Sequence, residues 1–284
     1  MSLLPKNEPM EKNITPKVFF IWGQSMHGKT YLARQFPAPI ILNTDGNGKK
    51  IDTPHVDIYD FETFVKVLRE IEEGKHTYKT IVIDLVDDIK TFLEEYVCKK
   101  YDVDTLADAP FGKAFADVKA TWKKLMIRLS QLPYYVVFIS HVIQVSDEYD
   151  NNKTIEQPSL EQKYLNMTKG RTDVMIKCQK VGKNYLQLCN EKRDWYRRDD
   201  IKDEDLYKTL SNVKQLFEDN KPTIQSVEPK KVITGKKPEI INADEETTKE
   251  EPTTNLKELA TELVEKKATA KKSLLIKKEE MNNG

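Results

Sequence analysis

An eight-residue stretch, GQSMHGKT, constrains the fold of this chain more than any other part of the sequence. It follows the apolar run KVFFIW (17–22) and fits the pattern GxxxxGK[S/T], which requires a strand before it and a helix after it. In such a loop the glycines let successive backbone amides point at phosphate oxygens, at which the helix also aims its positive end. A turn that binds nothing is the alternative. The predicted nucleotide-binding residues are Gly23, Gln24, Ser25, Met26, His27, Gly28, Lys29 and Thr30.

The last two residues of this stretch would carry part of the chemistry. Lys29 is expected to reach the β and γ phosphates of a nucleotide, and the Thr30 hydroxyl is expected to bind Mg²⁺. The metal also needs a carboxylate. The strand-like run TIVID (80–84) would deliver Asp84 to the carboxyl end of the sheet, beside the loop, where it can hold Mg²⁺ directly or through water. Alternatively, Asp84 caps the helix that follows.

Two more strand ends supply candidates for hydrolysis. The run PIILNTDG ends in Asp45, whose carboxylate would lie near the γ phosphate as a general base or water-positioning group. Alternatively, Asp45 and Gly46 only form a turn. The apolar run YYVVFISHV ends in Ser140 and His141, and His141 is placed to sense the γ phosphate, although a lone histidine is often structural. The predicted catalytic residues are Asp45, Lys29 and His141, and the predicted metal ligands are Thr30 and Asp84.

The hydrophobic pattern over residues 17–140 predicts an α/β domain with a mostly parallel sheet, because apolar runs alternate with helical stripes. Asp60 is a suitable N-cap for the first stripe, and both stripes are most simply core-facing. The stripes are Phe61, Phe64, Val65, Leu68 and Ile71, then Phe115, Val118, Trp122, Leu125, Met126 and Leu129. The strand-like runs are KVFFIW (17–22), PIILN (39–43), VDIY (56–59), TIVID (80–84) and YYVVFIS (134–140).

The pattern changes beyond Ser140. Residues 146–172 are polar and are predicted to form a loop. The runs DVMIKCQK (173–180) and NYLQLCNE (184–191) predict two strands joined through VGKN, in which Gly182 suits a tight hairpin turn. A last amphipathic helix is expected from Glu204 to Phe217.

The composition is uneven along the chain. After Phe217 there is no aromatic residue, and Lys, Glu, Thr and Pro dominate, so residues 220–284 are predicted to form a largely disordered tail. Residues 1–16 are predicted to be a flexible arm, and residues 17–219 the folded domain.

No apolar run approaches the roughly 20 residues of a membrane span and the N-terminus lacks a signal-peptide pattern, which predicts a cytoplasmic protein. Cys98, Cys178 and Cys189 follow no zinc spacing and are expected to be buried or half-buried thiols.

The segments GQSMHGKT, LNTDG, TIVIDLVDDI, FGKAF, VVFISHV and DVMIKCQK, in this order, resemble the phage nucleotide-binding proteins with a RecA-type core. Some members of that group are single-strand annealing recombinases. The resemblance covers residues 17–200 and implies a RecA-like P-loop ATPase that uses ATP and Mg²⁺. Asp45 matches the catalytic acid, which is glutamate in most members, and His141 matches a polar switch residue that is commonly glutamine. A basic residue often comes from the neighbouring subunit, and Lys192 or Arg193 matches it; alternatively, both belong to a solvated basic turn.

The resemblance also implies single-stranded DNA as a partner and a homo-oligomeric ring or filament. Because the formal net charge is zero, contact with DNA must come from a local patch. Residues 104–124 and 146–172 interleave aromatic and basic side chains, as single-strand binding requires, although an ordinary subunit interface is the alternative. The tail either recruits a single-strand-binding protein or another recombinase, or only solvates the domain. The predicted DNA-binding residues are Phe111, Lys113, Lys169 and Arg171.

Three functions follow from these features. The first is an ATP-hydrolysing RecA-like phage recombination protein that binds single-stranded DNA and promotes annealing or strand pairing. The second is a small-molecule kinase, in which Asp45 is the base and KRDWYRR an arginine lid. The third is a module in which bound ATP only sets the oligomeric state. Hydrolysis stimulated by single-stranded DNA favours the first, and transfer to a soluble hydroxyl favours the second.

Overall fold

The structure is a computed structural model, and it describes residues 14–46, 48, 52–146 and 154–217. Contacts divide the chain into two units, residues 1–224 and 225–284, and every described residue belongs to the first. The predicted tail, residues 220–284, and all but the last three residues of the predicted arm lie outside the described residues.

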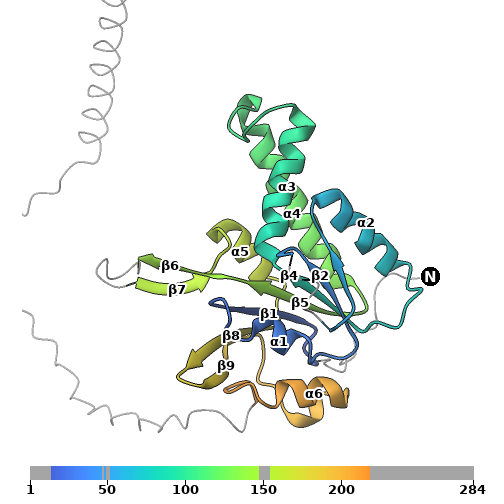
Figure 1. Ribbon diagram of the computed structural model, residues 1–284, viewed down its shortest axis with the longest axis vertical. Coiled ribbons are helices and arrows are strands. Elements are labelled where there is room, and N and C mark those ends of the chain that lie inside the picture. The colour runs from blue at the N-terminus through green and yellow to red at the C-terminus, as the bar shows by residue number, and fades with distance from the viewer. Residues whose placement is uncertain (1–13, 47, 49–51, 147–153, 218–284) are drawn as a thin grey trace, which may run out of the picture. The chain divides into compact units, whose positions relative to one another are not determined.

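A seven-stranded sheet forms the centre of the described unit, in the order β3-β2-β4-β5-β1-β8-β9 (Figure 1). All neighbouring strands are parallel except β8 and β9. This confirms the mostly parallel sheet and the C-terminal hairpin. The strands are β1 (Val18–Gly23), β2 (Pro39–Asn43), β3 (His55–Asp57), β4 (Thr80–Asp84), β5 (Tyr135–Ser140), β8 (Val174–Val181) and β9 (Asn184–Lys192).

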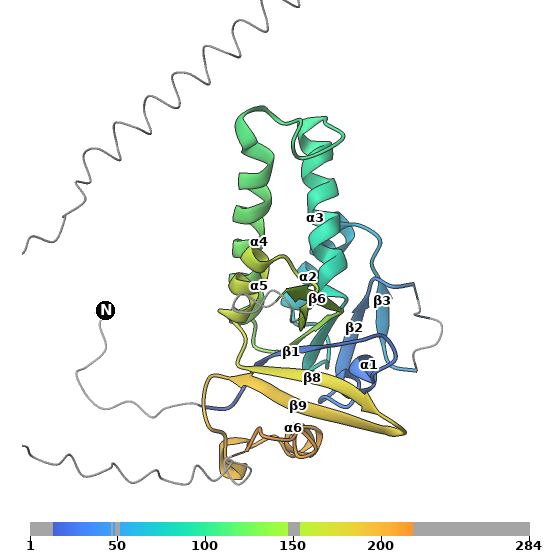
Figure 2. The same ribbon diagram turned by 90° about the vertical axis from the view of Figure 1, so that its left-hand side faces the viewer.

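Helices cover both faces of the sheet (Figures 1 and 2). Because side chains alternate along a strand, Phe20 and Trp22 of β1 face one core, and Phe19 and Ile21 face the other. The first core lies under α2 (Phe61–Glu72), α3 (Val86–Tyr101), α4 (Lys113–Gln131) and α5 (Gln162–Lys169), and the second lies against α1 (Lys29–Ala33) and α6 (Glu204–Leu210). Figure 2 shows α3 and α4 side by side, rising from the sheet.

The two predicted helical stripes are present, with one correction. The Asp60 carboxylate accepts a hydrogen bond from the Thr63 amide at 2.7 Å and caps α2 as predicted. Phe115, however, is 44% exposed, so its assignment to the core stripe of α4 was wrong. The buried stripe starts instead at Ala114, which is fully buried, and each step along a helix turns the side chain by about 100°. Phe115 therefore lies beside the stripe, with the Lys163 ammonium 6.0 Å from the centre of its ring.

The prediction of a loop over residues 146–172 was wrong in part. Within this stretch the structure places β7 (Thr154–Pro158), which pairs antiparallel with β6 (Val142–Ser146), and helix α5. The helix buries Tyr164 and Leu165, and the Tyr164 ring lies 5.7 Å from that of Trp122 on α4. These two apolar residues and the buried Thr168, among polar neighbours, give too weak a hydrophobic period to be recognised in the sequence. Residues 147–153, inside the same stretch, lie outside the described residues.

The last predicted helix is shorter than expected. It ends at Leu210 with Ser211 as its C-cap, and not at Phe217. Beyond the helix, isolated parallel bridges join Lys214 to Leu188 of β9 and Phe217 to Tyr196, which follows β9. Ser211 and Asn212 favour turns over helix interiors because their side chains compete for backbone hydrogen bonds. The apolar residues Val213, Leu216 and Phe217 are still buried, although they lie outside the helix.

The predicted hairpin is confirmed. Val181 pairs with Asn184 across the turn, and Gly182 has a positive φ of 61° there. The cysteines are also as expected: Cys178 and Cys189 are buried, Cys98 is half-buried, and all three are free thiols.

Candidate nucleotide-binding site

The phosphate loop runs from the last residue of β1 to the first turn of α1, at the carboxyl end of the parallel strands. Gly23 has a φ of 150°, and a Cβ atom at this position would lie 2.3 Å from the Cys178 carbonyl oxygen of β8. Gly28 has a φ of 84° and is the N-cap of α1. At Gly23 only glycine combines this φ with the lack of space for a Cβ atom. At Gly28 the positive φ alone favours glycine.

Lys29 lies inside this loop. Its side chain is buried, and its ammonium donates hydrogen bonds to the carbonyl oxygens of Gly23 at 2.9 Å and Gln24 at 3.0 Å. Burial lowers the pKa of Lys29, and the negative charges of Asp84 and Asp87 oppose that shift. Phosphate oxygens are stronger acceptors for a cation than carbonyl oxygens, so a bound phosphate would draw the ammonium away from these two carbonyls.

Thr30 and Asp84 are in direct contact. Asp84 is the last residue of β4, and its carboxylate accepts a hydrogen bond from the Thr30 hydroxyl at 2.7 Å. Burial raises the pKa of Asp84 to about 6; the Thr30 hydrogen bond opposes this shift and the charge of Asp45 adds to it. A hydroxyl and a carboxylate are the hard oxygen ligands that Mg²⁺ prefers, so these two residues fit the predicted metal.

A cation at this place would need ligands from the nucleotide as well. The described residues contain no group of three or more His, Cys, Asp or Glu side chains arranged to hold a metal ion by themselves. Mg²⁺ is commonly bound by one or two protein groups together with phosphate oxygens and water. Thr30 and Asp84 match that mode of binding.

Asp45 lies just beyond β2, beside Asp84. The preceding residue, Thr44, joins the ends of two strands: its amide donates to the Asp84 carbonyl at 2.7 Å, and its hydroxyl accepts from the Leu85 amide at 2.8 Å. Asp45 itself is exposed, and its charge raises the pKa of both Asp84 and His141. The structure thus brings Asp45 into the same group of charges as the predicted metal ligand and the predicted sensor.

His141 follows β5 and is held through its backbone. Its amide donates to Asp87 at 2.8 Å, and the buried Ser140 hydroxyl donates to the same carboxylate at 2.7 Å. Burial lowers the pKa of His141, with Lys29 contributing in the same direction. An imidazole with a lowered pKa is neutral at physiological pH and can donate or accept a hydrogen bond without adding charge.

Sequence reasoning missed Thr44, Asp87 and Asp88. Asp87 binds the end of β5, and Asp88 accepts a hydrogen bond from the Thr44 hydroxyl at 2.5 Å. The two carboxylates therefore hold the strand ends that carry His141 and Asp45. No local sequence pattern indicated these contacts, because each joins segments that are distant in the sequence.

A family model described as an AAA domain matches residues 15–199, which include the whole of this site. The chain belongs to the AAA domain family. Membership of this P-loop ATPase family implies nucleotide binding. A protein of Bacillus subtilis (strain 168), described as SPbeta prophage-derived uncharacterized protein YorG, is 26% identical over 147 residues, or 49% of this chain and 45% of that protein. The match thus spans less than half of the length of that relative. Neither the family match nor this similarity tests single-strand annealing, which remains a prediction.

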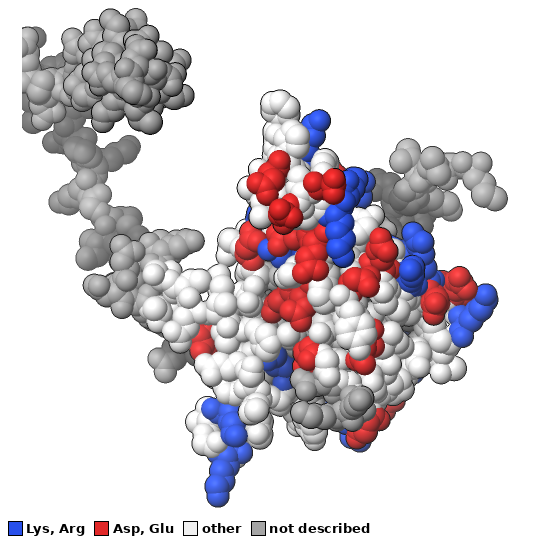
Figure 3. Space-filling model, turned by 45° about the horizontal axis from the view of Figure 1, so that its top comes forward, with Lys and Arg blue, Asp and Glu red and all other residues white. Residues whose placement is uncertain are grey.

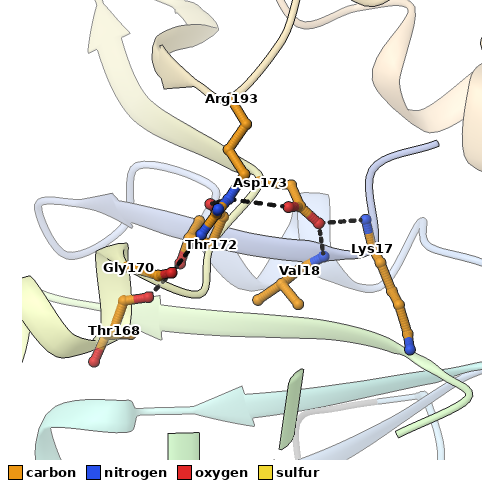
Figure 4. A network of polar contacts seen from close by, with 7 residues as sticks. All are labelled: Lys17, Val18, Thr168, Gly170, Thr172, Asp173 and Arg193. Atoms are coloured by element: carbon orange, nitrogen blue, oxygen red, sulfur yellow. Dashed lines mark hydrogen bonds and ion pairs between the residues drawn. The ribbon is translucent and has the colours of Figure 1, made fainter. Parts of the chain in front are cut away.

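Lys192 and Arg193 both have hydrogen-bond partners within the described residues. The Lys192 ammonium donates to the carbonyl oxygens of Gln215 and Leu216. Arg193 donates to the carbonyls of Thr172 and Gly170 and pairs with Asp173 at 3.2 Å (Figure 4). Asp173 in turn accepts from the Lys17 and Val18 amides. The network therefore lies where β1 begins, at the opposite end of that strand from the phosphate loop.

The predicted DNA-binding residues of the AAA domain do not form one cluster. Phe111 lies in the connection from α3 to α4, where it is 97% exposed with a positive φ of 57°, and Lys113 is the first residue of α4. Lys169 and Arg171 lie at the far end of α5, where Lys169 pairs with Glu191 at 2.6 Å. On the face of the molecule drawn in Figure 3, the described residues include both acidic and basic side chains, and the acidic ones are most frequent near the upper middle of the view. The structure thus separates an aromatic site at the end of the α3–α4 pair from two basic residues near the sheet.

The β6–β7 hairpin contacts the phosphate loop. Glu156 of β7 accepts a hydrogen bond from the Gln24 side chain at 3.1 Å and pairs with Lys177 of β8 at 2.9 Å. At its base, the Ser159 amide donates to the Ser140 hydroxyl at 3.1 Å and to the His141 carbonyl at 2.9 Å. The hairpin is therefore joined both to the phosphate loop and to the strand end that carries His141.

None of the helices among the described residues has the length and apolar composition that a bilayer crossing requires.

Proposed function

We propose that this AAA domain binds ATP with Mg²⁺ and hydrolyses it. The observation that carries the proposal is the convergence of Lys29, Thr30, Asp84 and Asp45 at the carboxyl ends of β1, β4 and β2. Lys29 neutralises charge on the phosphates, while Thr30 and Asp84 hold the metal. When bound, Mg²⁺ supplies further neutralisation of the phosphate charge.

Asp45 acts on the water that attacks the γ phosphate. Its exposed carboxylate stands near Asp84 and His141, and a carboxylate in that position orients the water and accepts its proton. His141 senses the γ phosphate, and the hydrogen bonds through Ser140 and Ser159 pass its position to the β6–β7 hairpin. The nucleotide state thereby reaches a surface element of the domain.

We further propose that the protein is a phage recombination protein of the RecA-like annealing group. It would bind single-stranded DNA, promote annealing or strand pairing, and assemble as a homo-oligomer in which hydrolysis regulates assembly. Lys192 or Arg193 would reach the neighbouring subunit's site, and the tail would recruit a partner such as a single-strand-binding protein. The similarity to a prophage protein and the exposure of Phe111 support this assignment.

The test uses two variants that separate binding from hydrolysis. Lys29→Ala should abolish ATP binding, whereas Asp45→Asn should keep binding and stop phosphate release, because only the group that acts on water is removed. If Asp45→Asn leaves DNA binding and annealing unchanged and Lys29→Ala abolishes both, ATP only sets the oligomeric state. If the phosphoryl group appears on a soluble hydroxyl compound, the protein is a kinase and the proposal fails.

A further inference from the structure

We propose that the pocket between the phosphate loop and the β8–β9 hairpin binds the base of the nucleotide, with Tyr185 stacking on the base and Gln187 selecting adenine. This inference rests on the proposed binding of a nucleoside triphosphate. It adds to that proposal the residues that recognise the nucleoside.

The pocket is continuous with the phosphate site. It has a volume of about 590 Å³, within the range of small-molecule sites. A ligand whose phosphates contact Lys29 and Thr30 therefore has room beside the loop for its remaining part. The lining residues are Met26, Gly28, Lys29, Thr30, Tyr31, Tyr185 and Gln187.

Three large apolar side chains are exposed around this pocket. Met26 is 90% exposed, Tyr31 65% and Tyr185 51%. Exposed apolar side chains that gather around a hollow mark a binding site, because a ligand that covers them removes their surface from water. A flat heteroaromatic ring is suited to cover two tyrosines and a methionine, since aromatic faces attract one another beyond the burial of area.

Tyr185 is held next to the loop. Its Cδ1 atom lies 3.5 Å from the position that a Cβ atom of Gly28 would take, so the ring reaches the residue that precedes Lys29. The Lys180 ammonium lies 5.3 Å from the centre of the ring. Tyr185 of β9 pairs with Lys180 of the neighbouring strand β8, and this pairing fixes the position of Tyr185 in the hairpin.

Gln187 has a fixed backbone and a side chain that can read a base. It pairs with Cys178 of β8, and its carbonyl accepts a hydrogen bond from the Lys214 amide at 2.9 Å. Its amide group carries both donors and an acceptor, which matches the donor and acceptor edges of adenine. Among the described residues that line the pocket there is no Asp or Glu, whose carboxylate would accept both N–H groups of guanine together, so the pocket favours adenine.

Isothermal titration calorimetry with Mg²⁺ present tests this inference, using ATP, GTP and inorganic tripolyphosphate as ligands. Tyr185→Ala should weaken ATP binding roughly 5- to 150-fold, the range for losing one base-stacking contact, and leave tripolyphosphate binding unchanged. Tyr185→Phe should restore ATP binding. Gln187→Leu should reduce the preference for ATP over GTP. Val181→Ala, on the same hairpin but outside the lining, is the matched control and should bind ATP like the parent protein.

The outcomes separate this inference from the proposed function. If the parent protein binds neither ATP nor tripolyphosphate, the proposed function fails. If it binds both equally well, or if Tyr185→Ala weakens both equally, the base pocket is wrong while phosphate binding stands. Tighter binding of GTP than of ATP would overturn the assignment of adenine.

Discussion

At the scale of single residues, Gly23 is both the last residue of β1 and the first residue of the phosphate loop. Its φ is 150°, and the Cys178 carbonyl oxygen occupies the space that a side chain would need. We predict that Gly23→Ala lowers the free energy of unfolding by on the order of 2–5 kcal/mol, through backbone strain and overpacking together. Urea denaturation measures this change.

Gly182→Ala is the control for that prediction. Gly182 also has a positive φ, of 61°, but no atom lies within 4 Å of the position that its Cβ would take. Its replacement should cost only about 1 kcal/mol, from strain alone. Equal losses for the two variants would show that contact with Cys178 is unimportant.

Asp84 provides a prediction about pH. Burial raises its pKa from 3.8 to about 6, so between these values the folded protein binds more protons than the unfolded chain. Its contribution to stability is therefore present below about pH 4 and is lost as the pH rises through about 6. We expect Asp84→Asn to raise the free energy of unfolding by on the order of 1–3 kcal/mol at about pH 7.5, and by less at about pH 5.

Urea denaturation of the ligand-free protein at both pH values measures this difference. The same variant should bind Mg²⁺-ATP more weakly, because it lacks the carboxylate. A variant that is less stable than the parent by the same amount at both pH values would contradict the account of Asp84.

At the scale of elements, the connection from α3 to α4 offers a test of the DNA assignment. Phe111 has a positive φ of 57°, which glycine adopts without strain, and it is 97% exposed. Phe111→Gly should therefore keep the fold, changing the free energy of unfolding by less than about 1 kcal/mol. If Phe111 stacks on bases, the variant should bind a fluorescent single-stranded oligonucleotide roughly 5- to 150-fold more weakly.

Tyr59→Ala is the matched control, because Tyr59 is also an exposed aromatic residue, at 69%, and lies outside both predicted DNA-binding stretches. Its oligonucleotide affinity should equal that of the parent. Unchanged affinity in Phe111→Gly would remove Phe111 from the proposed DNA site.

The segment around Arg193 gives another prediction for an element. Arg193 ties the start of β8 to the end of α5 through Gly170, Thr172 and Asp173 (Figure 4). We expect Arg193→Ala to lower the free energy of unfolding by about 1–3 kcal/mol, because the carbonyl oxygens of Thr172 and Gly170 lose a charged hydrogen-bond donor. Mixing it with Lys29→Ala tests the proposed role across subunits: recovery of ATP hydrolysis would show that Arg193 acts on a neighbour.

The secondary-structure elements also show which parts of the fold can be predicted from the sequence. The strands β2 and β4 were predicted to the residue, since each is a run of apolar residues buried on both faces of a parallel sheet. Helix α5 was missed because only Tyr164, Leu165 and Thr168 are buried in it. The roles of Asp87 and Thr44 depend on contacts between strand ends that are distant in the sequence, which no local pattern contains.

At the scale of the whole molecule, one edge of the sheet is proposed to respond to both the nucleotide and a partner. The carboxyl ends of β1, β2, β4 and β5 carry the residues for nucleotide chemistry, and the β6–β7 hairpin connects that edge to the surface. The central claim is that nucleotide hydrolysis and binding of single-stranded DNA are coupled in this AAA domain.

Phosphate release from Mg²⁺-ATP, measured with and without a single-stranded oligonucleotide, tests this claim most directly. Lys29→Ala is the blank, because its phosphate loop lacks the cation that holds the phosphates. The account predicts that DNA stimulates phosphate release in the parent protein and has no effect in Lys29→Ala. Release at the same rate with and without DNA would contradict the coupling and leave a nucleotide-binding protein with a different partner.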